Sequence, residues 1–358
     1  MASLSGDLQP QLELNSVRGL ACVALVAYHV IGPTKDSGLH LPNTSYWHVL
    51  MNSMDFLRMP MFTVVSGYFY AGHRVDRATL QEFFRKKASR LLAPLLFVTT
   101  VMFVLRQAVY GDQTSYVEAL LFHYQHLWFL QSLIIIFAGI AVWDTYRRPG
   151  WPELCIAAFA AIMVTRTFEV TRFLSLNGVL YLAPFFALGI VFRTQPDILR
   201  SRDLVFVAVG VAVIVLTMQQ MAAALGGIPL IRNSMPAAVC GIAGAYVLMA
   251  RFPRVRLLEI IGTFSFSIYL WHSIAASAVR QSILVNLALP TAITFIVLLA
   301  VGIAFPIAIH LVVERMPLLS IFAAGIRHRS ARRGAHEASR PQPQNCKQAL
   351  SESDTTRT

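Results

Sequence analysis

The sequence predicts an all-helical, polytopic membrane bundle with about ten transmembrane helices, and three observations support this fold class. Hydrophobic residues make up 56% of the 358 residues and charged residues only 13%, a balance outside the range of soluble globular domains. The mean hydropathy is +0.58. The apolar runs approach the length of about 20 residues that crosses a bilayer, and they lack the alternating polarity of barrel strands.

Ten apolar runs, bounded by Pro, Gly and charged residues, mark the expected helices in chain order. They cover residues 14–32, 54–72, 91–110, 127–146, 152–165, 174–192, 204–224, 235–250, 258–279 and 287–313. The fifth run is short. The tenth is long enough to be tilted, or broken at Pro306.

Basic residues predict the orientation of these spans. Lys and Arg concentrate in the gaps after the second, fourth, sixth and eighth runs. Because cytoplasmic loops carry an excess of Lys and Arg, these gaps are expected to face the cytoplasm. Both termini then lie there too, with residues 1–13 as a cytoplasmic N-terminus, 14–326 as the transmembrane domain and 327–358 as a disordered, basic cytoplasmic tail. A removable signal peptide is not expected, because the first thirteen residues contain no Lys or Arg.

Several classes of function find no support in the sequence. The net charge of +12 follows from the loop topology, and no aromatic-interleaved basic motif indicates a nucleic-acid partner. The four cysteines show no paired spacing, so neither a disulfide framework nor a zinc site is expected. His123 and His126 have a spacing compatible with a metal pair, but no third ligand is apparent. We therefore expect no metal site.

The first run contains two ionisable residues, Arg18 and His29. In a helix they lie about 20° apart around the axis and roughly 16 Å apart along it, so they share one face at two depths. In one interpretation Arg18 snorkels to lipid phosphates and His29 bonds a neighbouring helix. Because ionisable residues inside a membrane are costly and usually face a cavity or a substrate path, the pair favours a functional role.

Six segments resemble, in order, the motifs of one membrane family. They are LNSVRGLACVALVAYH (14–29), MPMFTVVSGYFY (59–70), FFRKKASRLLAP (83–94), HLWFL (126–130), FSFSIYLWH (264–272) and VVERMP (312–317). Together they are similar to acyltransferase family 3, whose first helix has an Arg or Lys, ten residues and then a His. Asn15 differs, since many relatives have Asp at that position.

The resemblance implies transfer of an acyl group, most often acetyl, from acyl-CoA to a hydroxyl of a cell-surface carbohydrate, a lipid-linked glycan or a related acceptor. It also implies a multi-pass protein of a bacterial inner membrane, in contact with lipids. Acetyl-CoA or another acyl-CoA is then the donor substrate, and no tightly bound cofactor is expected.

The chemistry of this reaction assigns roles to four residues. A hydroxyl that attacks a thioester needs a base near neutral pH, which imidazole supplies, so His29 is the expected catalytic base. CoA carries phosphates, which Arg binds bidentately and Lys as a point charge. Arg18, Lys87 and Arg90 are therefore the expected donor-binding residues, with Arg18 also counted as catalytic. For the basic loop, a role in topology alone remains open.

Five further residues are candidates for acceptor binding: Tyr269, His272, Arg58, Trp128 and Glu314. Each has a structural alternative. Tyr269 and His272 suit interhelical hydrogen bonds, Arg58 suits snorkelling, Trp128 suits the aromatic belt of the interface, and Glu314 suits an ion pair with a basic loop. We expect donor and acceptor to enter from opposite faces of the membrane.

A carrier for a small solute or a glycan-related molecule is the alternative function, because carriers also need ionisable residues at mid-membrane. The sequence shows no internal repeat and no broken helices in matching halves. A purely structural bundle is a third possibility, but it leaves the common face of Arg18 and His29 unexplained. The oligomeric state is not predicted.

Overall fold

The computed structural model describes residues 5–42, 45–122, 124–224, 234–282, 287 and 289–326. Within these residues the chain is helical and forms no strand, apart from one isolated bridge between Phe122 and Phe173. The all-helical prediction is thus confirmed for the described part of the chain. The expected tail at 327–358 and His123 lie outside it.

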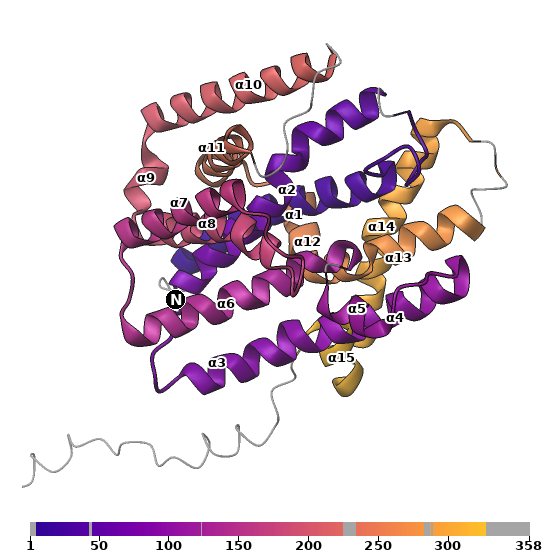
Figure 1. The fold of residues 1–358 in the computed structure, drawn as a ribbon, viewed down its shortest axis with the longest axis horizontal. Coiled ribbons are helices and arrows are strands. Elements are labelled where there is room, and N and C mark those ends of the chain that lie inside the picture. Colours follow the sequence, from indigo (N-terminus) through magenta and orange to yellow (C-terminus); the bar gives the residue numbers. More distant parts are fainter. Residues whose placement is uncertain are drawn as a thin grey trace, which may run out of the picture. The chain divides into compact units, whose positions relative to one another are not determined.

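The helices follow one another along the chain (Figure 1). They are α1 (Ser5–Ile31), α2 (Tyr46–Ala71), α3 (Leu80–Lys87), a π-helical turn η1 (Ala88–Leu92), α4 (Ala93–Tyr110), α5 (Tyr116–Leu121), a 3₁₀ turn η2 (Gln125–Leu127), α6 (Trp128–Tyr146), α7 (Trp151–Thr167), α8 (Leu176–Thr194), α9 (Pro196–Arg200), α10 (Arg202–Ala224), α11 (Met235–Arg251), α12 (Arg256–Thr263), α13 (Ser265–Ser282), α14 (Thr291–Val313) and α15 (Pro317–Ala324).

Each of the ten apolar runs contains a helix, but several helices differ in detail from the prediction, among them α2, which begins at Tyr46, ahead of the second run. The ninth run, 258–279, holds two helices, because the chain breaks between α12 and α13 at Phe264. In the tenth run α14 continues through Pro306 without ending there. α1 begins at Ser5, ahead of the first apolar run.

The predicted count of about ten spans is not confirmed. Among the described residues, six helical segments are long and apolar enough to cross a membrane, or seven if the bent pair α11 and α12 counts as one span. The six contain α1, α4, α6, α8, α10 and α14. α7 has only 17 residues. α2 and α13 both carry Arg, His and Ser within their lengths, and α2 also carries Asp55, so these polar residues lower the apolarity of both helices.

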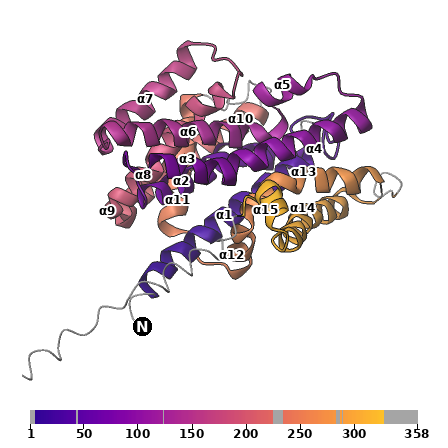
Figure 2. The same cartoon turned by 90° about the horizontal axis from the view of Figure 1, so that it is seen from below.

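α1 lies in the middle of the described bundle, with α2 on one side and α13 and α14 on the other (Figures 1 and 2). Glycines bring the central helices to backbone contact. A Cβ added to Gly19 of α1 would lie 2.0 Å from the carbonyl oxygen of Leu258, and one added to Gly262 of α12 would lie 1.9 Å from that of Asn15. α1 and α12 therefore approach as closely as two helices without side chains can.

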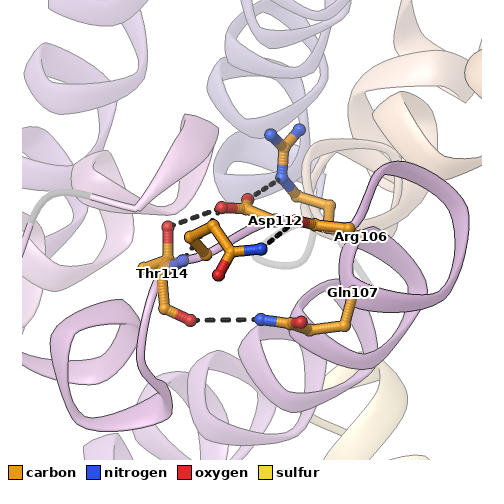
Figure 3. Close-up of polar contacts among 6 residues, drawn as sticks. Arg106, Gln107, Asp112 and Thr114 are labelled. Atoms are coloured by element: carbon orange, nitrogen blue, oxygen red, sulfur yellow. Dashed lines mark hydrogen bonds and ion pairs between the residues drawn. The ribbon is translucent and has the colours of Figure 1, made fainter.

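A polar cluster closes the loop that follows α4 (Figure 3). Arg106 Nε donates to Asp112 Oδ2 at 2.8 Å, and the backbone N–H and hydroxyl of Thr114 donate to Asp112 Oδ1 at 3.1 and 2.7 Å. Gln107 Nε2 donates to the carbonyl oxygen of Thr114 at 3.2 Å. The hydrogen bonds from Arg106 and then Thr114 favour the carboxylate, so they lower the pKa of Asp112 to about 2.

Candidate active site along the first helix

Arg18 and His29 both lie against α13. The Arg18 guanidinium donates through Nη2 to Ser265 Oγ at the start of α13, and the His29 ring lies 5.0 Å from that of His272, two turns further along the same helix. The sequence predicts that Arg18 and His29 share one face of the helix, and this is the face of α1 that contacts α13.

The Arg18 end of α1 is cationic. Asn15 Oδ1 accepts from Arg18 Nη1 at 3.3 Å, and because Asn is neutral it leaves the positive charge of Arg18 without compensation at this contact. Arg90 lies close enough to repel both Arg18 and Lys87. The three residues expected to bind the donor are therefore gathered at one end of α1.

The Lys87 side chain lies over two aromatic rings near the Arg18 end of α1. Its Nζ lies 3.3 Å from the ring centroid of Phe137 on α6 and 5.4 Å from that of Phe83 on α3. Such cation–π contacts hold an ammonium group in place without neutralising it. Lys87 is the last residue of α3 and Arg90 lies within η1, so the π-helical turn sets the directions of these two side chains relative to each other. π-Helical turns are frequent at functional sites.

The His29 end of α1 is formed by three imidazole rings. The His29 ring centroid lies 5.7 Å from that of His126 and 5.0 Å from that of His272, and the last two are 4.8 Å apart. His126 and His272 are 3% and 0% exposed. Among the described residues, no group of three or more His, Cys, Asp or Glu side chains has a geometry that could hold a metal ion.

His126 is brought inward by a strained turn. Gln125 has a φ of 48°, which is uncommon outside glycine and costs about 1–3 kcal/mol, and the 3₁₀ turn η2 begins there. The Tyr269 hydroxyl donates to the His126 carbonyl oxygen at 2.6 Å and accepts from the Leu130 N–H at 3.3 Å. Tyr269 thus makes interhelical hydrogen bonds, its structural alternative, and it fixes the turn that carries His126.

His272 has a defined proton arrangement. Its Nδ1 lies 2.8 Å from the Ile268 carbonyl oxygen and 2.9 Å from that of Tyr269. Because carbonyls only accept hydrogen bonds, Nδ1 carries a proton. Nε2 of His272 and Nε2 of His126 are both buried and have no hydrogen-bond partner among the residues that the structure describes.

Arg58 lies next to this cluster. It is 4% exposed, pairs through Nη2 with Asp55 and places its guanidinium carbon 3.2 Å from the ring centroid of Tyr28, whose ring in turn lies 5.1 Å from that of His29. Nε and Nη1 of Arg58 are buried and lack partners within the described ranges. A guanidinium buried with unused donors does not fit simple snorkelling.

Trp128 and Glu314 lie in different surroundings. Trp128 is 8% exposed and packs on Gly178 of α8, where an added Cβ would lie 2.8 Å from its ring. Glu314 caps the end of α14, where its carboxylate lies 3.8 Å from Nε2 of His310. His310 Nδ1 in turn lies 2.7 Å from Ser267 Oγ. The basic side chain that the structure places beside the Glu314 carboxylate, His310, thus lies on the preceding helix α14 and not in a basic loop.

Sequence reasoning missed two features of this region. Spacing suggests His126 only as a metal ligand beside His123, although it stands at the start of the HLWFL segment and lies beside His29. A buried network of Tyr70, Arg74 and Asp144 was also missed: Tyr70 donates to Asp144 at 2.7 Å, and Arg74 lies 3.7 Å from the same carboxylate. No spacing rule connects residues so far apart in sequence.

The family model of an acyltransferase domain matches residues 11–311, which include Arg18 and His29 of α1 and five of the six motifs, while the sixth, at 312–317, follows directly after the matched region. The chain belongs to acyltransferase family 3. It is thus a membrane protein of an acyltransferase family, and the helices that carry Arg18, His29, His126 and His272 all lie inside the matched region.

This family member is similar to nodulation protein NolL of Mesorhizobium japonicum, with 27% identity over 177 residues. The aligned segment covers 48% of this chain and 46% of NolL, so the chain matches about half the length of that relative. No solved structure matches the chain.

Proposed function

We propose that the protein is a membrane-bound O-acyltransferase that moves an acyl group, acetyl in the first instance, from acyl-CoA to a hydroxyl of a cell-surface carbohydrate or lipid-linked glycan. The observation that carries the proposal is the division of α1 into two ends against one helix: a cationic end at Arg18 and an imidazole end at His29. In acyl-CoA the phosphates match the cationic end, and the thioester matches the imidazole end.

The cationic end suits the phosphates of CoA. Arg18, Lys87 and Arg90 together offer three positive charges, and the side chains that accept hydrogen bonds from Arg18, Asn15 and Ser265, are both neutral. Charge-assisted hydrogen bonds to phosphate are about twice as strong as neutral ones. With the nucleotide at this end, the pantetheine arm extends along α1 over the rise of roughly 16 Å between Arg18 and His29.

At the other end His29 acts as the base. It removes the proton of the acceptor hydroxyl as the oxygen attacks the thioester carbon, the carbon–sulfur bond breaks, and the CoA thiolate takes the proton back from His29. One thioester is consumed and one ester is formed, with no net change in the protonation of the protein. Burial strengthens each polar interaction in this step because the local dielectric is low.

Arg58 is proposed to bind the acceptor, since its unused buried donors lie one ring away from His29. The start of the same helix α2 supplies exposed Tyr46 and the ring of Trp47, which packs 4.8 Å from Phe295. Carbohydrates are commonly held by such mixtures of aromatic and hydrogen-bonding groups. Acceptor-binding roles for Tyr269, Trp128 and Glu314 rest on the family resemblance, whereas His272 is completely buried and is not proposed to contact the acceptor.

The orientation is part of the proposal. With both termini in the cytoplasm of a bacterial inner membrane, CoA binds from the cytoplasm and the acceptor reaches His29 from the opposite side. The basic loops support this direction.

Purified protein in liposomes, supplied with acetyl-CoA labelled in the acetyl group and with a glycolipid extract of bacterial envelopes, tests the reaction. We expect alkali-labile label in the glycolipid fraction, and none with His29→Ala protein that inserts normally. Accumulation of label inside the vesicles without an ester product would instead indicate a carrier.

Sealed vesicles of known orientation test the sidedness. Acetyl-CoA is supplied on the side of the basic loops and the glycolipid acceptor on the other, and transfer is expected in this arrangement. Transfer only when both lie on the side of the basic loops would overturn the cross-membrane arrangement.

A further inference from the structure

Two buried imidazoles beside His29 have no role in the acyl transfer proposed for that residue. His272 of α13 and His126 of η2 each present an Nε2 atom that is buried and without a hydrogen-bond partner among the described residues. An unpaired buried polar atom costs about 1–3 kcal/mol. Two such atoms next to the expected base indicate a function that offsets this cost.

The proton arrangement of His272 shows what its Nε2 offers. Nδ1–H donates to the carbonyl oxygens of Ile268 and Tyr269. A proton on Nε2 as well would make a buried cation whose second N–H has no acceptor, so the resting ring is neutral and Nε2 is a lone pair. His272 is therefore a fixed hydrogen-bond acceptor.

Among the residues that it describes, the structure shows no hydrogen bond at Nε2 of His272, but His29 is close enough for one to form when its ring turns toward His272. Two rings joined by one N–H···N bond of about 2.9 Å have centroids about 5 Å apart. The His29–His272 distance of 5.0 Å matches this value, and the 5.7 Å between His29 and His126 is longer. His126 packs edge-on against His272 at 4.8 Å, as a packing neighbour, because Nδ1 of His272 already donates to two carbonyl oxygens.

A metal site and direct contact with the acceptor fit the three rings less well. A metal ion is not favoured, because no described group of three His, Cys, Asp or Glu side chains has a metal-binding geometry. Direct contact between His272 and the acceptor is not favoured either, because His272 is completely buried behind His29. The other titratable side chains that ring contacts place beside the cluster are Tyr28, Tyr269 and, through Tyr28, Arg58.

We propose that His272, with His126 behind it, is a positioning residue for His29: its Nε2 accepts an N–H from the His29 ring and shares the proton that His29 holds between attack and departure of the thiolate. The hydrogen bond fixes the orientation and tautomer of His29, so that its other nitrogen faces the acceptor hydroxyl. When the proton is shared, the two carbonyl oxygens on Nδ1 stabilise the cation. The proton returns along the same bond to His29 and then to the thiolate, so the protein is unchanged after each cycle.

This inference rests on the proposed function and is tested by variants at His272. His272→Phe keeps the ring packing but removes both nitrogens, and we expect kcat to fall by about 100-fold. His272→Gln restores an acceptor near the position of Nε2, and we expect a fall of only about tenfold. The KM for acetyl-CoA should stay within about twofold of the parent in both, because Arg18 and the basic residues near it are untouched.

Rescue of His272→Ala by small molecules distinguishes a chemical role of the His272 ring from a packing role. His272→Ala leaves a space of imidazole size, and added imidazole is expected to restore part of kcat. Pyrrole has the same size and an N–H but no basic lone pair, so it is expected to restore none. Tyr246→Phe, which removes hydrogen bonds to Ile198 and Ser201 elsewhere in the bundle, is the control for loss of stability and should keep the parent kcat.

The outcomes distinguish the positioning role from the proposed function. Equal kcat for the parent and His272→Phe, or equal rescue by pyrrole and imidazole, overturns the positioning role while leaving the acyl transfer intact. If His272→Phe does not fold, the rescue of folded His272→Ala decides. Absence of transfer by the parent overturns the proposed function, and the positioning role with it.

Discussion

The two ends of α1 both contact α13, but through different kinds of group. At the Arg18 end, charged groups meet neutral partners and aromatic rings, and Arg90 is exposed. At the His29 end, neighbouring imidazoles are almost fully buried and carry unused lone pairs. The charge of exposed Arg90 is screened by water and salt, whereas Arg18, Lys87 and His29 are half-buried and their polar interactions are screened less. Under the proposed function, phosphate binding and proton transfer thus take place at different ends of one helix.

The sharpest test of this separation is at His29. His29→Gln keeps a hydrogen-bonding group but removes the basic nitrogen, so we expect kcat to fall by about 10²–10⁴-fold. Initial rates at saturating acetyl-CoA measure this, with membrane insertion checked by size-exclusion chromatography. If His29→Gln retained its turnover, His29 would not be the base, and the two ends of α1 would no longer differ in function as proposed.

The opposite end should respond in binding. Arg18→Ala removes charge-assisted hydrogen bonds worth about 1.5–3 kcal/mol each, so we expect the KM for acetyl-CoA to rise by about tenfold or more while kcat changes less. Arg18→Lys, which keeps the charge but not the bidentate geometry, should lie between. Calorimetric titration with CoA checks the assignment, which unchanged affinity in Arg18→Ala would contradict.

Arg58 tests whether the imidazole end also holds the acceptor. Arg58→Lys removes the planar group that lies over Tyr28 but keeps a cation for Asp55, and we expect kcat/KM for the glycolipid acceptor to fall by about tenfold. The KM for acetyl-CoA should not change. An effect on both substrates alike would point to a structural role for Arg58.

Smaller effects are expected in the basic loop. Lys87→Ala and Arg90→Ala should each raise the KM for acetyl-CoA by about two- to threefold. The effect of Arg90→Ala should shrink at high salt because Arg90 is exposed, and that of Lys87→Ala should shrink less because Lys87 is half-buried. Lys86→Ala is the matched control, since Lys86 is one residue away and pairs with Glu82 at 2.9 Å. If Lys86→Ala has the same effect, the loop contributes only its net charge.

The smallest effect lies away from both ends, in the loop after α4. Because the folded protein lowers the pKa of Asp112 to about 2, below the unfolded value of about 3.9, its carboxylate stabilises the fold above about pH 4 and this contribution is lost as the pH falls toward 2. Asp112→Asn should lower the Tm at pH 7 by about 2 °C, a modest shift for a pair near the surface. The Tm difference between the parent and Asp112→Asn should be smaller at about pH 3 in detergent. The kcat and KM values should not change.

The sequence predicts some parts of this arrangement and not others, for physical reasons. Arg18 and His29 are recognisable because a single helix relates them, and helical periodicity is regular. The gathering of Lys87 and Arg90 near Arg18 follows only in part, since the π-helical turn η1 has no clear sequence pattern. The place of His126 was not predictable, because it depends on a positive φ at Gln125 and on a hydroxyl from Tyr269, which is distant in the sequence.

The number of membrane spans shows the same limit of prediction from the sequence. Apolarity locates the ten helical regions, but α2 and α13 fall below a membrane criterion because they carry the polar groups of the site, among them Arg58 and His272. Their polarity is compensated by neighbouring helices, a tertiary effect that a hydropathy profile does not contain.

The backbone contact between α1 and α12 has a consequence for motion. Since Gly19 and Gly262 bring the two helices together with no side chain between them, sliding one past the other would drive carbonyl oxygens into Cα atoms. α1 and α12 can therefore move only as a single rigid body, and Arg18 and His29 keep a constant separation during any such movement. Under the proposed function, the donor then lies along a helix of constant geometry, and the fixed separation of Arg18 and His29 determines the length of donor that reaches from one residue to the other.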